Sequence, residues 1–576
     1  MMYGPVPPRP KKTSIVRSRN GCKGCRERRT KCDEQKPSCG TCTRLGKCCE
    51  PVRRGFKFCE VAGPTSGETS TRLEDRISTP ATSEDSDQPI VDLVRIPSLD
   101  LVNSLHHTER DVFYSTYWED ACLPALHPMF GSISFSAGEQ SMLKDTILAL
   151  SSCNISRIKP DRRGPSTRPV AAFSPNLVHQ TRSQLYYSSA IKRFISLNRS
   201  DVRSNAVIVF TVLVLFAYIE SSMGNFQGFQ CHVQGLTSFL LELREVMGGT
   251  MLKALLSAWM QVRFVVWWAR AYFSSINVYR DLPSVRLPAL LAENFNTMQE
   301  RRVVVLGIMC ESHRLNSREA LRHWEPDTND NESEIPSHQT GVRKTADTIF
   351  LQLAEQANKL DEWLACLPPS ELPYSVYSKQ SNSPQRVFDN TDDPIYFESH
   401  NAALNFAYYV VARIMQCTGL LRGLENPSIF HSAPILFEEE AWVRFLLRVA
   451  KGTNITDSIS KNSYTIGFSG LMLAAMLRCQ DISLGVDIQN WLEALQRLQP
   501  TEEGAFPVYQ TLGVVKAVNQ QKMIGRDIFS VTLPSDDAGG TPKLTAYNSQ
   551  TISTLLFHGR CQSSGELFTD CISIDL

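Results

Sequence analysis

Apolar residues recur every three to four positions along most of the chain, the spacing that brings them to one face of an α-helix. This pattern predicts helices over residues 109–121, 141–153, 183–197, 229–243, 251–273, 345–367 and 399–421. Alternating apolar and polar residues beside an Asn-Gly or Asp-Gly turn, the signal of a β-hairpin, are hard to find. We therefore predict an all-α fold.

Changes in composition divide the chain into regions. The helical pattern occupies residues 105–529, and the chain of 576 residues is too long for a single core. Residues 53–104 are rich in Ser, Thr, Pro and acidic side chains and poor in aromatic ones, so we predict a flexible linker there. The tail, 530–576, is rich in Gly, Ser and Thr, and we expect it to be poorly ordered.

One apolar stretch raises the question of a membrane span. Residues 206–219 (AVIVFTVLVLFAYI) carry no charge, and Arg203 and Glu220 bracket them closely. A helix needs about 20 apolar residues to cross a bilayer. We therefore predict a buried core helix and no membrane association.

Charge is distributed unevenly. The chain has 60 lysines and arginines and 59 acidic residues, but its first 58 residues contain 16 of the former and only 4 of the latter. The basic segment begins with a proline- and arginine-rich arm, 1–20, which lacks the apolar core of a secretory signal and is predicted to be disordered. A basic end on a mildly acidic body is typical of a protein that binds a polyanion.

Cysteine clusters in the same basic end. Of the 17 cysteines in the chain, 7 lie between residues 22 and 49. Because no export signal is expected, we interpret them as metal ligands and not as disulfides. Thiolate-rich sites favour zinc. Six cysteines are too few for two separate four-ligand sites, but they suffice if two thiolates bridge two ions.

The cysteine spacing, the basic run RERRTK and Pro37 resemble the Zn2Cys6 binuclear zinc cluster of fungal transcription factors. The resemblance implies a DNA-binding domain over 21–52 that holds two zinc ions. It assigns Cys22 and Cys39 as bridging ligands, Cys25 and Cys32 to one ion, and Cys42 and Cys49 to the other. Cys48 is an alternative sixth ligand, but it follows Cys42 after five residues where the family has six.

The basic run lies between two predicted ligands and contains Arg26, Arg28, Arg29 and Lys31. Arginine and lysine commonly contact guanine O6 and N7 in the major groove of double-stranded DNA. The resemblance implies recognition of CGG-like triplets, with Arg28 and Arg29 reading bases and Arg26 and Lys31 contacting phosphates. A solvated charged turn or a nuclear-import patch is the simpler alternative.

Segments of the helical region, such as 207–240 and 404–421, resemble the regulatory domain found behind this cluster in many fungal factors. The two resemblances imply a nuclear, sequence-specific regulator of RNA polymerase II transcription. A small-molecule inducer, and contact of 565–576 (GELFTDCISIDL) with the transcription machinery, are further hypotheses. Prolines at 51, 64 and 80 interrupt the region where a coiled coil would follow, so homodimer and monomer both remain open.

The common catalytic patterns G-x-G-x-x-G, G-x-x-x-x-G-K-[ST] and H-E-x-x-H do not occur, and we predict that the protein is not an enzyme. Two other classes of protein are alternatives to a transcription factor. A zinc enzyme would use histidine or carboxylate ligands and an open coordination position, unlike an all-thiolate cluster. A zinc-stapled scaffold that binds protein would lack salt-dependent affinity for DNA.

Overall fold

The computed structural model divides the chain into two compact units, Met1–Leu93 and Val94–Leu576. The residues that it describes are 22, 25, 30, 32–33, 35, 38–46, 49, 107–159, 175–244, 248–272, 275–276, 282–292, 295–324, 338–374, 392–425, 433–504, 506–534 and 554–574. The predicted arm at 1–20 and the predicted linker at 53–104 lie outside them.

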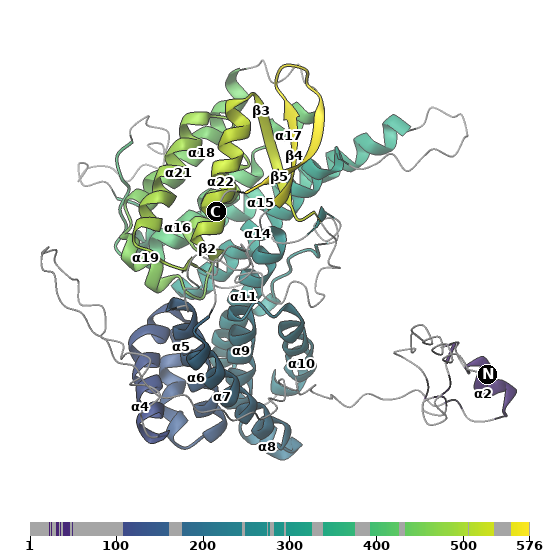
Figure 1. Ribbon diagram of the computed structural model, residues 1–576, viewed down its shortest axis with the longest axis vertical. Coiled ribbons are helices and arrows are strands. Elements are labelled where there is room, and N and C mark those ends of the chain that lie inside the picture. The colour runs from purple at the N-terminus through teal and green to yellow at the C-terminus, as the bar shows by residue number, and fades with distance from the viewer. Residues whose placement is uncertain are drawn as a thin grey trace, which may run out of the picture. The chain divides into compact units, whose positions relative to one another are not determined.

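Helices build most of the second unit (Figure 1). Its first part contains α4 (His107–Tyr117), α5 (Met129–Ser134), α6 (Ser141–Ile158), α7 (Leu177–Ile195), α8 (Arg199–Ser204), α9 (Ala206–Ser222), α10 (Phe226–Arg244) and α11 (Gly249–Tyr272). Side chains fix where several of these helices begin. Asn176 caps α7, and Asn198 forms a reciprocal capping box with Asp201 at α8.

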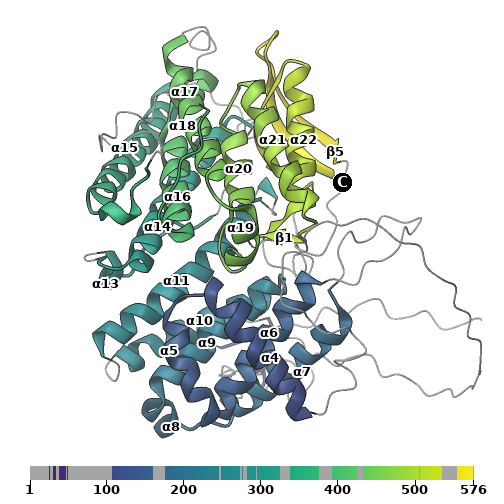
Figure 2. The same cartoon turned by 90° about the vertical axis from the view of Figure 1, so that its left-hand side faces the viewer.

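The second part contains α13 (Ala289–Ala292), α14 (Met298–Arg322), α15 (His338–Ala365), α16 (His400–Gln416), α17 (Gly419–Glu425), α18 (Ala433–Lys451), α19 (Ile455–Lys461), α20 (Phe468–Met476), α21 (Ile482–Arg497) and α22 (Val508–Met523). Within this unit, α4 to α10 gather at one end and α15 to α22 at the other, and α11 and α14 pass between them (Figure 2). This helical architecture confirms the predicted fold class.

The apolar stretch at 206–219 forms most of α9, and its side chains are buried almost without a break from Val209 to Ser221. A helix that is apolar on all sides is stable in a soluble domain only when other elements surround it. Here α6, α10 and α11 pack around α9. Among the described residues, no helix is long and apolar enough to cross a membrane.

The prediction of a poorly ordered tail over 530–576 is wrong for its described residues. The strands β3 (Arg526–Thr532), β4 (Thr554–Cys561) and β5 (Leu567–Ser573) form an antiparallel sheet in the order β3-β4-β5. A smaller ladder pairs β1 (Glu502–Glu503) with β2 (Phe506–Pro507). Leu555 and Phe557 of β4 are buried in the main core, so the tail is part of the fold.

Polar contacts fasten this sheet to the helices. The indole N–H of Trp324, at the end of α14, donates to the carbonyl of Phe568 at 2.9 Å. The guanidinium of Arg478 donates to the carbonyl of Phe529 at 2.7 Å. In the middle of the sheet, His558 bridges Thr532 at 2.9 Å and Thr569 at 3.1 Å, which ties the three strands together.

Candidate zinc cluster

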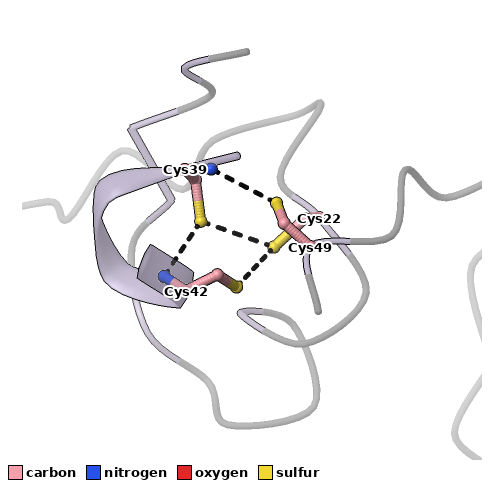
Figure 3. Close-up of side chains that lie close together, drawn as sticks. All are labelled: Cys22, Cys39, Cys42 and Cys49. Carbon is pink, nitrogen blue, oxygen red and sulfur yellow. Dashed lines mark hydrogen bonds between the residues drawn. The ribbon is translucent and has the colours of Figure 1, made fainter. Parts of the chain in front are cut away.

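The first unit brings six cysteines together although they are spread over 28 positions of the chain. Their sulfur atoms form two groups of four, and within each group all sulfurs lie within 4.8 Å of one another. One group consists of Cys22, Cys25, Cys32 and Cys39, and the other of Cys22, Cys39, Cys42 and Cys49. Both groups contain Cys22 and Cys39, which is the arrangement that two ions sharing two thiolates require. Figure 3 shows the second group.

The sulfur separations suit tetrahedral zinc. With a Zn–S bond of about 2.3 Å, two sulfurs on one tetrahedral ion lie about 3.8 Å apart. The measured separations are 3.7 Å from Cys22 to Cys39, 3.5 Å from Cys22 to Cys42 and 3.6 Å from Cys25 to Cys39. A disulfide needs about 2.0 Å, so none of these pairs is bonded.

The short helix α2 (Gly40–Arg44) explains the second Cys-x-x-Cys pair. Cys39 is its N-cap residue, and the backbone N–H of Cys42 donates to the Cys39 sulfur at 3.4 Å. The N–H of Cys39 donates in turn to the sulfur of Cys49 at 3.3 Å. Backbone hydrogen bonds to sulfur stabilise thiolates, so this turn is suited to metal ligation.

Cysteines are also the only buried side chains of the first unit among its described residues. Cys25 and Cys42 are fully buried, and Cys49 is partly exposed. A module with so small an apolar core needs a metal or another staple to fold. The cluster therefore serves as the core of this unit.

The predicted DNA-contacting residues Arg26, Arg28, Arg29 and Lys31 lie outside the described residues, as does Cys48. What the structure describes is the two ends of their segment. Cys25 is in helical conformation and fully buried, and its carbonyl accepts from the N–H of Thr30 at 3.0 Å. Cys32 is also buried. Both ends of the basic run are thus held at the cluster.

Asp33 contributes to the site although no motif pointed to it. Its carboxylate accepts from the backbone N–H of Gly40 through both oxygens, at 3.2 and 2.9 Å. Asp33 directly follows Cys32, and Gly40 directly follows Cys39. The contact therefore connects the residue after Cys32, a ligand of the first group only, to the residue after Cys39, a ligand of both groups. The sequence offered one signal for it, an acceptor next to a cysteine.

Hydrogen bonds within the cluster shift the pKa values of its thiols in opposite directions. The backbone N–H of Cys25 donates to the sulfur of Cys22 and lowers the pKa of that thiol. A hydrogen bond with Cys39 lowers the pKa of Cys42, but burial and hydrogen bonds with Cys22 and Cys49 outweigh it and raise the pKa to about 11. Divalent cations deprotonate coordinating thiols outright, so zinc would remove this conflict.

Comparison with known proteins bears on the same segment. Residues 20–57 match the model of the fungal Zn(2)-Cys(6) binuclear cluster domain. The chain carries this domain at its N-terminal end. The domain binds two zinc ions, and the two overlapping sulfur groups fit a binuclear centre. Zinc as the cofactor is thereby confirmed.

Curated relatives extend the comparison. The chain is 32% identical over 100 residues to Sterol uptake control protein 2 of Candida albicans, which covers 13% of this chain and 14% of that protein. It is 28% identical over 157 residues to the Zn(2)-C6 fungal-type transcription factor afumD of Aspergillus fumigatus, covering 26% and 35%. It is 25% identical over 226 residues to the aspercryptin biosynthesis cluster-specific transcription regulator atnN of Emericella nidulans, covering 38% and 33%.

The matched segments thus span about a third or less of these relatives. No solved structure matches the chain significantly. Together, these comparisons give a zinc-cluster domain at the N-terminal end of the chain and relatives that are named as transcription factors. They agree with the prediction that the protein is not an enzyme.

Proposed function

We propose that the protein is a nuclear, sequence-specific regulator of RNA polymerase II transcription that recognises CGG-like triplets through its zinc cluster. The observation that carries the proposal is the pair of four-sulfur groups that share Cys22 and Cys39. Such a cluster holds the basic run at both ends, at Cys25 and Cys32. A basic segment fixed to a rigid scaffold is suited to reading base edges, whereas a free basic segment supplies only charge.

The proposed ligand set has three roles. Cys22 and Cys39 bridge the two ions, Cys25 and Cys32 complete the first, and Cys42 and Cys49 complete the second. Three sulfur–sulfur distances close to the value expected for two ligands of one tetrahedral zinc ion support this set. So does the hydrogen bond that the backbone N–H of Cys39 donates to the sulfur of Cys49. Substituting Cys49 by Ser should release zinc, whereas Cys48→Ser should keep both ions. Elemental analysis of the purified protein distinguishes the two ligand choices.

The proposed DNA contacts divide into two kinds. Arg28 and Arg29 read guanines, and Arg26 and Lys31 neutralise phosphates. Losing a bidentate guanine contact costs roughly 1–3 kcal/mol and relaxes the preference at one base pair, whereas losing a phosphate contact weakens binding to all sequences. The two kinds of contact therefore leave different signatures in binding data.

For the helical unit we propose the role of a regulatory domain. The match to atnN spans 226 residues, many more than the zinc domain, so it includes part of the helical unit. We propose that a small-molecule inducer supplies the regulatory signal to this unit and that the transcription machinery receives it. The machinery contact suggested for 565–576 now has to involve a folded strand, since Asp570 pairs with Arg526 and Ile574 is buried.

The decisive experiment selects bound sequences from a random pool of double-stranded DNA, using the full-length protein with zinc. We expect enrichment of a CGG-like triplet, and loss of enrichment at one base position for Arg29→Ala. Arg53→Ala, outside the cysteine-held segment, should keep the same preference and weaken binding at every site. A pool that shows no enriched sequence, or zinc-independent enrichment, would refute the proposal.

A further inference from the structure

Arg302, near the start of α14, is a buried arginine whose charge has no carboxylate partner among the described residues. The residue is 6% exposed. Its Nε donates to Oδ1 of Asn405 at 2.6 Å, and its Nη2 donates to Oδ1 and the carbonyl of Asn401 at 2.9 and 3.4 Å. Both asparagines are neutral and lie one turn apart on α16. A buried charge without an opposite charge beside it is costly, so this guanidinium is suited to binding an anion.

The groups around Arg302 do not supply the negative charge. The carboxylate that acts on it most directly is that of Glu371, and Arg301 already donates to both oxygens of that carboxylate. The phenols of Tyr218 and Tyr408 also act on Arg302, but burial raises the pKa of both, so neither is ionised. One positive charge is therefore left over at this place in the described part of the helical unit.

A second buried arginine shows how neutral groups can satisfy a guanidinium completely. In Arg478, Nε donates to Asn316 at 2.6 Å and Nη2 donates to Ser317 at 2.9 Å. Its Nη1 donates to the carbonyl of Phe529 at 2.7 Å, so each nitrogen has an acceptor. In Arg302, by contrast, Nη1 donates to no acceptor within the residues that the structure describes. Its N–H groups can still bind a ligand.

His127 offers a second donor beside this guanidinium. It lies two residues before α5 and is 7% exposed. Its Nδ1 accepts from the N–H of Met129 at 3.2 Å, which leaves the proton of a neutral imidazole on Nε2. Burial and the charge of Arg302 lower the pKa of His127 to about 4, against a smaller contribution from Glu300, which binds Lys253. The ring is thus neutral near pH 7, and none of the described residues accepts from its Nε2–H.

We propose that Arg302 and His127 bind the carboxylate of a small organic acid, one oxygen at Nη1 of Arg302 and the other at the Nε2–H of His127. A carboxylate carries one negative charge, which equals the charge left over, and its two oxygens can accept from both donors. A phosphate dianion would leave a negative charge buried. The proposal rests on the regulatory role proposed for the helical unit and assigns its small-molecule inducer to the monocarboxylic acids.

The two donors connect the two ends of the helical unit. His127 precedes α5, in the end formed by α4 to α10, whereas Asn401 and Asn405 belong to α16, in the end formed by α15 to α22 (Figure 2). Arg302 lies on α14, which passes between these ends. Ligand sites commonly lie where two parts of a protein meet. A carboxylate bound by both donors would join the two ends and stabilise the folded unit.

The test measures the melting temperature of the full-length, zinc-loaded protein in acetate, propionate and benzoate, with sodium chloride keeping the ionic strength constant. A ligand that binds only the folded state raises this temperature. We expect a saturable rise with at least one of the three carboxylates and none with sodium phosphate. No rise with any carboxylate would overturn the proposal, and an equal, saturable rise with phosphate would overturn the choice of a carboxylate.

Three variants test the two donors, and equilibrium dialysis against the radiolabelled acid gives their dissociation constants. Arg302→Met removes the charge at similar length and should abolish binding. His127→Asn keeps an acceptor for the N–H of Met129 but removes the Nε2 donor, and should raise the dissociation constant about tenfold. The matched control is Arg444→Met, which removes the same charge from a partly exposed pair with Asp392 and should bind as the wild type does.

Circular dichroism shows whether each variant is folded, and His127→Asn tests the site even if Arg302→Met does not fold. Wild-type affinity in His127→Asn or in folded Arg302→Met would refute the assignment. None of these measurements involves DNA. Zinc-dependent enrichment of a CGG-like triplet without carboxylate binding would overturn this proposal alone. Carboxylate binding without any enriched sequence would support this site and refute DNA recognition.

Discussion

Asp33 shows how one side chain can set the geometry of a metal centre without binding the metal. Its carboxylate holds the N–H of Gly40 and so connects the two ligand-bearing segments. Gly40 is the first residue of helix α2, so its N–H lies at the positive end of the helix dipole. A charged acceptor therefore stabilises this contact more than a neutral one would. Residues that orient metal ligands typically contribute 10- to 100-fold to metal affinity.

We therefore predict that Asp33→Ala lowers zinc affinity by about 10- to 100-fold and that Asp33→Asn, which keeps an oxygen acceptor, loses less. The measurement is competition for zinc between the full-length protein and a chromophoric chelator. Asp457→Ala, which removes a half-exposed carboxylate from the helical unit, is the control and should leave the affinity unchanged. Equal affinities for Asp33→Ala and the wild type would contradict the positioning role.

Glu439 is a second residue with a measurable consequence. It is buried on α18, and burial raises its pKa to about 7, with a smaller contribution from Glu438. The folded state therefore holds a proton between about pH 4.5 and 7 that the unfolded state has released. Stability from this carboxyl is present below its ordinary pKa and is lost as the pH rises through 7.

Glu439→Gln removes this titration. We expect the wild type to lose about 2–4 kcal/mol relative to the variant between pH 5 and pH 8. Denaturant unfolding at both pH values measures the difference. The matched control is Asp457→Asn, at a half-exposed site, which should follow the wild-type pH dependence within error. A variant that tracks the wild type would show that Glu439 is ionised throughout this range.

At the scale of elements, α20 shows what a buried helix requires. All of its residues, Phe468 to Met476, are buried. Glu503 accepts from the N–H groups of Phe468 at 3.0 Å and Ser469 at 2.7 Å, and the ammonium of Lys522 donates to the carbonyl of Met476 at 3.1 Å. A negative charge at the first turn and a positive charge at the last complement the helix dipole and satisfy groups that water cannot reach.

Glu503→Ala should lower the free energy of unfolding by about 3–5 kcal/mol, because it leaves several buried donors without an acceptor. Besides the two N–H groups, these donors are the Ser458 hydroxyl and the Asn462 amide, both at 2.7 Å. Chemical denaturation provides the measurement. Glu493→Ala, which breaks a surface pair with Lys516, should cost less than about 1 kcal/mol. Similar costs for the two variants would refute the capping role.

Elements differ in how far the sequence predicts them. Helix α9 was predictable because 14 successive residues without a charge, nearly all of them apolar, fit only a buried or membrane environment. Strand β4 was not, since its sequence TLLFHGRC places His558 and Arg560 inside the protein. Both are tolerated because Thr532 and Asp527, in another strand, supply their partners. Sequence periodicity cannot reveal such distant polar contacts.

The residues of the zinc cluster also differ in how far the sequence predicts them. Cysteine spacing is a local property, so the six sulfurs could be chosen from the sequence, and the structure brings all six together. Asp33 could not be chosen, because its partner is a backbone N–H seven residues away whose direction depends on the turn at Cys39. Almost every residue type has a backbone N–H. A side chain that bonds to one therefore leaves no pattern of residue types that the sequence could reveal.

At the scale of the whole molecule, the cysteine cluster and the helical core belong to separate compact units. The first depends on metal, because its described core consists of cysteines. The second has a continuous apolar core from Tyr114 to Ile574, in which the described cysteines form no metal-ligand group. Zinc should therefore stabilise one unit and leave the other unaffected.

We predict that a strong chelator abolishes DNA binding by the full-length protein while the thermal transition of the helical unit shifts by less than about 2 °C, since a ligand stabilises only the cooperative unit that binds it. Circular dichroism at 222 nm reports that transition, because nearly all described helix lies in the second unit. Restoring zinc should recover DNA binding. Chelation that lowered the helical transition by tens of degrees would mean that the two units fold as one, and that the cluster regulates the helical unit through its stability.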